Sequence, residues 1–129
     1  MPTKISFRLQ HPTMDLAEIA KGIGLPIARI WTSGKGRKTL KGDPLDGVYP
    51  ESYCAFKVTE AETISAAIII IDAALQLIAN SHAVLQYPDL KKSLYCTLMD
   101  EGEIIDKESL GLLVKWGIQL EIDGNQESV

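Results

Sequence analysis

Four short segments of the chain alternate apolar and polar side chains, and this pattern constrains the fold more than any other feature. The segments cover residues 5–9, 54–58, 94–98 and 118–122. A period of two places the apolar side chains of a strand on one face of a sheet and the polar side chains on the other. We therefore expect four strands in one sheet, with one buried and one open face. The expected inward side chains are Ile5, Phe7, Leu9, Cys54, Phe56, Val58, Leu94, Cys96, Leu98, Ile118, Leu120 and Ile122.

A long apolar segment, "ETISAAIIIIDAALQLIAN", covers residues 62–80 and is too long for one strand. Its polar side chains fall on one narrow stripe at helical spacing, which predicts a helix. The apolar residues extend well beyond the face needed to pack on a sheet, and a helix of this kind must be covered on more than one side. The last helix of the chain or a second copy could supply the cover, and we expect a homodimer. The stripe consists of Glu62, Ser65, Asp72, Gln76 and Asn80.

Two further helices and a short strand complete the expected order. A helix is expected over 14–24, a short strand over 26–31, and a last helix before Gly117 with Asp106 as its N-cap. The order is β-α-β-β-α-β with an added α-β, which matches the ferredoxin-like arrangement of the α+β class. We expect a single domain over residues 1–129, an antiparallel or mixed sheet, and helices on one face.

The formal net charge of −4 is unevenly distributed along the chain. Residues 1–42 carry eight basic and two acidic side chains, whereas residues 100–129 carry two basic and eight acidic ones. Such a chain could steer an anionic ligand to one end or pair head to tail with a copy of itself, and solvated faces of opposite sign are the alternative.

Several features favour a cytoplasmic location. The start "MPTKISFRLQ" has no apolar stretch of the kind found in signal peptides. Asp72 interrupts the longest apolar run, which is shorter than the roughly 20 residues of a membrane span. Cys54 and Cys96 lie far apart, so we expect reduced thiols.

The segment 28–44, "ARIWTSGKGRKTLKGDP", holds five basic residues and no acidic residue before Asp43. It lacks the glycine spacing of both the P-loop and the dinucleotide fingerprint. With four glycines and two prolines, residues 33–50 are interpreted as a long solvated loop whose charge could attract an anionic partner. The candidate ligand- or anion-binding residues of this segment and of the open sheet face are Arg8, Arg29, Lys35, Arg37, Lys38, Tyr53 and Tyr95.

Signals for catalysis are weak. The two cysteines are expected on the inward face of their strands, and His11 and His82 lack the spacing of a helical metal site. Acidic residues near 100–108 lack the EF-hand spacing. We therefore expect no catalytic residue, no metal and no cofactor, and we lean against an enzyme while leaving that question open.

The chain resembles a known family over nearly its whole length. The succession "ISFRL", "MDLAEIAKGIGLP", "TSGKGR" and "SYCAF", together with the closing "DKESLGLLVKWGIQLEID", is similar to the bacterial family catalogued as domain of unknown function 4279. The shared motifs are structural. The resemblance therefore implies a bacterial protein of this fold, and it implies neither an activity nor a site.

These observations favour a small cytoplasmic protein that acts by binding another protein, as a regulatory or toxin-neutralising (immunity-like) module does. The first alternative is a nucleic-acid or anion binder that uses the basic 29–41 segment and the open sheet face, where aromatic side chains could stack bases. The second is a small-molecule enzyme with a site built from loops. We expect a homodimer and a protein partner, and neither nucleic acid nor a membrane.

Overall fold

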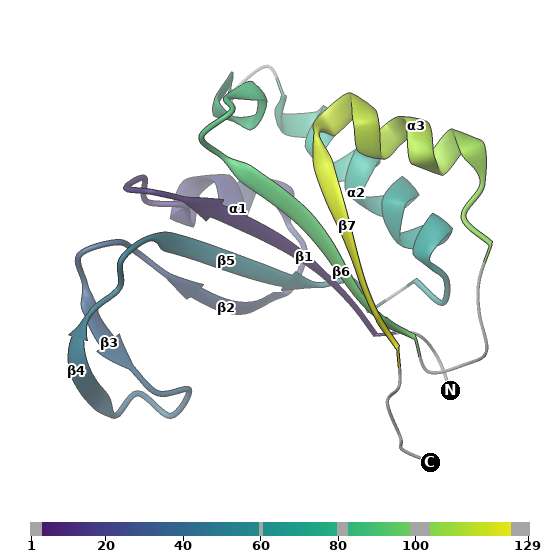
Figure 1. The fold of residues 1–129 in the computed structure, drawn as a ribbon. Helices are drawn as coiled ribbons and strands as arrows, with labels where there is room; N and C mark the ends of the chain where they lie inside the picture. The colour runs from purple at the N-terminus through teal and green to yellow at the C-terminus, as the bar shows by residue number, and fades with distance from the viewer. Residues whose placement is uncertain (1–3, 60, 80–82, 99–103, 125–129) are drawn as a thin grey trace, which may run out of the picture.

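The described part of the chain folds into a mixed α+β structure with one five-stranded sheet, three α-helices and a separate two-stranded hairpin (Figure 1). This computed structural model describes residues 4–59, 61–79, 83–98 and 104–124. The strands are β1 (Lys4–His11), β2 (Ile27–Trp31), β3 (Gly36–Lys38), β4 (Pro44–Val48), β5 (Ser52–Lys57), β6 (Lys91–Leu98) and β7 (Ile118–Gly124). The helices are α1 (Ala17–Ile23), α2 (Ile64–Ile78) and α3 (Lys107–Trp116), with a short 3-10 helix at Ala83–Gln86.

The large sheet has the strand order β2-β5-β1-β6-β7. The central strand β1 is antiparallel to both β5 and β6, and β2 is antiparallel to β5. Strand β7 is parallel to β6, which requires a crossover, and α3 lies in that connection. The four alternating segments thus lie in strands β1, β5, β6 and β7 of one sheet, as the sequence predicts.

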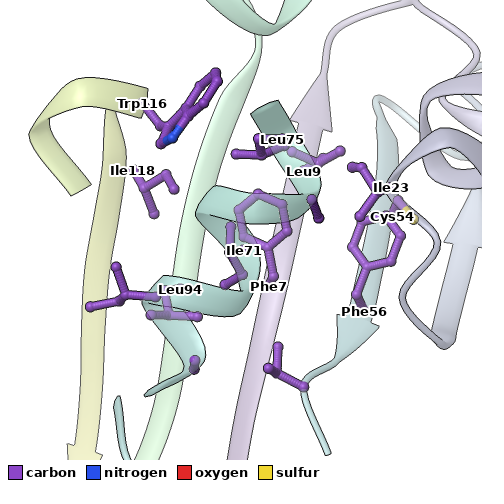
Figure 2. Close-up of a cluster of buried hydrophobic side chains, with 14 of the residues drawn as sticks. Phe7, Leu9, Ile23, Cys54, Phe56, Ile71, Leu75, Leu94, Trp116 and Ile118 are labelled. Carbon is purple, nitrogen blue, oxygen red and sulfur yellow. The ribbon is translucent and has the colours of Figure 1, made fainter. Parts of the chain in front are cut away.

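All three helices lie on one face of the sheet, and the core fills the space between them (Figure 1). Phe7 and Phe56 are completely buried on neighbouring strands, with ring centroids 5.9 Å apart. Figure 2 shows the buried side chains between the sheet and α2, with Trp116 and Ile118 on the side of α3 and β7. The inward side chains predicted from the alternation form this core, apart from three. Leu120 is half-buried, Ile122 is 49% exposed, and the side chain of Leu98 lies outside the described residues.

Helix α2 begins where Thr63 caps it, since the Thr63 side chain accepts a hydrogen bond from the backbone N–H of Ala66. Its inner side is buried against the sheet, as expected for a helix, whereas Ile69 and Leu77 on its outer side are exposed. Asn80, the last residue of the predicted stripe, lies outside the described residues. None of the helices in the described ranges has the length and apolar character needed to cross a membrane.

Asp72 joins α2 to α3. The indole Nε1 of Trp116 donates to Asp72 Oδ1 at 2.8 Å, and Lys115 Nζ lies 3.3 Å from the same oxygen. The Trp116 hydrogen bond is the main reason why the pKa of Asp72 is lowered, and bonds from Lys115 and Gln76 contribute less. Asp72 belongs to the polar stripe of α2 and also accepts hydrogen bonds from α3, so it links the two helices.

The predicted ends of the last helix are confirmed. Asp106 is the N-cap of α3, and its carboxylate accepts from the backbone N–H of Ser109 at 2.8 Å. Gly117 ends the helix with a φ of 65°, in the left-handed region that favours glycine.

The interpretation of residues 33–50 as one long loop is wrong in part, because β3 and β4 pair there as an antiparallel hairpin. All side chains of the two strands are exposed, so burial leaves no alternating pattern to find in the sequence. Tyr49 holds the hairpin together, since its hydroxyl accepts from the N–H of Lys38 and donates to the carbonyl of the same residue.

Candidate binding site

The sheet face opposite the helices carries polar and aromatic side chains in rows that run across the strands. The register places Trp31, Tyr53, Gln10 and Lys91 in one row, and Arg29, Ala55, Arg8, Ser93 and Gln119 in the next. A third row holds Lys57, Ser6, Tyr95 and Glu121. The positions in β1, β5, β6 and β7 continue the alternation that the sequence predicts for these strands, whereas Arg29 and Trp31 of β2 were not assigned to this face from the sequence. Met99 would continue the alternation of β6 onto this face, and it lies outside the described residues.

Tyr95 is engaged on its ring face and at its hydroxyl. The Arg8 guanidinium lies over the ring, with its Cζ 4.3 Å from the centroid, and the hydroxyl donates to Asp123 Oδ2 at 2.9 Å. Glu121 pairs with Tyr95 in the register. Two candidate residues therefore contact each other beside two acidic side chains, which would repel a phosphate.

Tyr53 belongs to a cluster of stacked rings, which we call the aromatic cluster (Trp31, Tyr49 and Tyr53). The indole of Trp31 stacks on Tyr53 at a centroid distance of 4.4 Å and on Tyr49 at 4.7 Å. Arg29 also contacts this cluster, with its Cζ 4.8 Å from the Trp31 ring centroid. Trp31 and Tyr49 were not among the residues predicted from the sequence, although the outward position of Trp31 on a predicted strand was an available signal.

The aromatic cluster and a few hydrogen bonds hold the base of the hairpin against the sheet. The buried hydroxyl of Ser52, the first residue of β5, accepts from the N–H of Ser33 at 3.0 Å. The N–H of Gly34 donates to the Tyr49 carbonyl, and the N–H of Tyr49 donates to the Lys35 carbonyl. Both ends of the hairpin are thereby fixed at the end of β2 and the start of β5.

Between β2 and the hairpin lies a cleft of about 540 Å³, which we call the basic cleft. Three of the predicted basic residues, Arg29, Lys35 and Lys38, line it together with exposed Ile30 and Leu40. The full lining is Ala28, Arg29, Ile30, Trp31, Thr32, Lys35, Gly36, Lys38, Thr39, Leu40, Gly42 and Tyr49. A site of this volume is large enough for a short peptide segment or a small molecule.

A second cleft, of about 540 Å³, adjoins the basic cleft and shares four of its residues. Arg37 lies there with Leu45 and Val48, and its Nη1 donates to the Asp46 carbonyl at 3.3 Å. The hairpin thus brings together the basic candidates from residue 29 onward. Arg8 lies apart from these residues, on β1. In the register Ala55 of β5 lies between Arg8 and Arg29, which separates their backbones by roughly 10 Å.

The described ranges contain no group of three or more histidine, cysteine or acidic side chains placed to hold a metal ion. His11 is the last residue of β1, and its Nδ1 accepts from the N–H groups of Thr13 and Met14. His82 and the acidic residues 100–103 lie outside the described residues. Burial raises the pKa of the Cys54 thiol to about 11, which disfavours the reactive thiolate.

Comparison of the chain with family models, with curated proteins and with solved structures found no match. The resemblance to the bacterial family named above therefore stays a prediction.

Proposed function

We propose that this chain is a small cytoplasmic protein that acts by binding an acidic protein partner, as a regulatory or immunity-like module. The observation that carries the proposal is the basic cleft, where Arg29, Lys35 and Lys38 meet two exposed apolar side chains, Ile30 and Leu40. Cationic groups next to exposed apolar side chains suit a protein surface that offers carboxylates and apolar groups together.

The contacts of the aromatic side chains favour a protein partner over nucleic acid. Modules that bind single strands need ring faces on which bases can stack. Trp31 stacks on both Tyr49 and Tyr53, and Arg8 lies over the ring of Tyr95. The nucleic-acid alternative thus needs these contacts to break before a base can stack.

We also propose that the sheet has the ferredoxin-like topology with α3 and β7 added. The support is the order β2-β5-β1-β6, in which β1 is antiparallel to both of its neighbours. This arrangement is also what the proposed membership of the bacterial family implies.

The partner proposal is tested by affinity capture from a cytoplasmic extract of the source cell. A Lys35→Glu/Lys38→Glu variant should capture at least tenfold less partner than the unmodified chain, because it reverses two charges of the basic cleft. The matched control is Lys57→Glu/Lys91→Glu, which makes the same charge change at exposed positions elsewhere on the open face. Equal loss in both variants would show that only net charge matters and would contradict the proposal. Capture of nucleic acid in place of an acidic protein would support the alternative.

We propose in addition that two copies associate through the outer face of α2. Leu77 and Ile69 are 85% and 57% exposed there, and Ala73 lies between them in the sequence. This face carries no charged side chain at positions 66, 69, 70, 73 or 77, so two copies could meet without like-charge repulsion.

Leu77→Glu should therefore convert a dimer into a monomer in size-exclusion chromatography with light scattering. Val114→Glu, at an exposed position on α3, is the control and should leave the dimer mass unchanged. A monomeric mass for the unmodified chain at high concentration would show that the association is wrong.

A further inference from the structure

Strand β2 lies at the end of the large sheet, where it pairs with β5. Within the described residues no strand pairs with its other side. An edge strand presents unpaired N–H and C=O groups, and proteins commonly cover such an edge. In this chain the hairpin lies beyond the edge of β2 (Figure 1), and the basic cleft separates the two.

The cleft follows the backbone edge of β2. Its lining includes five consecutive residues, Ala28 to Thr32. A cleft over one face of a strand would meet alternate residues, because successive side chains point to opposite faces. Consecutive lining residues indicate that the strand edge itself forms the wall. Four of these residues, Ala28 to Trp31, belong to β2 and Thr32 follows it. Five residues in extended conformation span roughly 17 Å, which is the length of an extended peptide of about the same number of residues.

The positive charge of the basic cleft favours an acidic occupant. None of the described residues that line it is acidic, whereas three are basic. Arg29 Nη2 and the Lys38 carbonyl join the two walls at 3.4 Å, near the upper limit for a hydrogen bond. A carboxylate would compete well for this guanidinium, because a charge-assisted hydrogen bond is stronger than a neutral one. Leu40, which is 79% exposed, and Ile30 offer contacts for apolar side chains.

We infer that an extended acidic segment of the partner protein adds to the large sheet as a sixth strand along β2. Hydrogen bonds to the β2 backbone hold the segment, and alternate side chains meet the basic and apolar residues of the cleft, as in other cases of β-strand addition. This inference rests on the proposed function and specifies how the partner binds.

The test uses the full chain and a phage-displayed library of random octapeptides, with the Lys35→Glu/Lys38→Glu variant for counter-selection. The expected peptides alternate acidic and apolar residues. One selected peptide is then synthesised with N-methyl groups on its odd-numbered residues and, separately, on its even-numbered residues. In a strand alternate N–H groups point to the same neighbour. One N-methylated form should therefore bind at least tenfold more weakly than the parent peptide, and the other should bind nearly as tightly.

The outcomes separate this inference from the proposed function. If both N-methylated peptides bind like the parent, the strand addition is wrong, while charge-dependent binding at the cleft stands. If both lose affinity equally, a strand geometry is likewise excluded. If the library yields no peptide that discriminates against the variant, strand addition is overturned, and the capture experiment still decides the proposed function. Tighter binding of a single-stranded oligothymidylate than of any selected peptide would overturn the inference in favour of nucleic acid.

Discussion

Phe7→Ala should lower the free energy of unfolding by about 3–5 kcal/mol, the usual cost of removing a buried phenylalanine ring. Phe7 is completely buried on the central strand β1, and its ring lies against that of Phe56. The substitution leaves a cavity between the sheet and α2 that the neighbouring side chains fill only partly (Figure 2). The loss would be a large fraction of the stability of a single domain, which is about 5–15 kcal/mol. Urea unfolding followed by circular dichroism measures it.

Val114→Ala is the matched control for the Phe7 variant. Val114 lies on α3 and is 82% exposed, so its truncation should change the unfolding free energy by no more than about 0.5 kcal/mol. A Phe7 variant as stable as this control would mean that the ring is not buried under α2. The arrangement of sheet and helices described above would then be wrong.

Asp72→Ala should destabilise the chain by about 1–3 kcal/mol, because it leaves the buried indole N–H of Trp116 without its acceptor. Lys115 is half exposed, and the loss of its ion pair should add little. Asp72→Asn is the control, since its amide oxygen can still accept from Trp116 while the charge is lost. In thermal or urea unfolding at neutral pH, the Asp72→Asn variant should be clearly more stable than the Asp72→Ala variant. Equal loss in both variants would contradict the role of this hydrogen bond.

The Asp72 carboxylate also makes the stability of the fold depend on pH. The pKa of Asp72 is lowered in the folded chain, first of all by the Trp116 hydrogen bond. A carboxyl group with a lowered folded pKa stabilises the fold at pH values above its unfolded pKa of about 4. This stabilisation is lost as the pH falls through the folded pKa. The stability difference between the native chain and Asp72→Asn should therefore be greatest near neutral pH and shrink in acid.

Much of the large sheet could be predicted from the sequence, because burial of one face leaves a period of two in strands β1, β5 and β6. Asp106 and Gly117 marked the ends of α3, since caps depend on local chemistry. Ile122 was expected inside because it continues the alternation of β7. Ile122 is half exposed because β7 is the outer strand of the sheet. The alternation in the sequence does not reveal how far the helices cover the sheet toward this edge.

The candidate site was predictable only as a set of charges. Lys35, Arg37 and Lys38 stand out in the sequence, but the fully exposed strands β3 and β4 leave no apolar period from which a hairpin could be inferred. The stacking of Tyr49 on Trp31 joins residues on opposite sides of that hairpin. Strand register decides such contacts, and one sequence does not contain it.

The hairpin is inserted between β2 and β5, which are themselves antiparallel neighbours. A tight turn could connect these two strands directly, so the sheet does not depend on the inserted segment for its connectivity. Residues 34–48 can consequently change in length and composition while the hydrophobic interior keeps its packing. The binding specificity that we propose for the basic cleft could thus diversify in this insert on an unchanged scaffold.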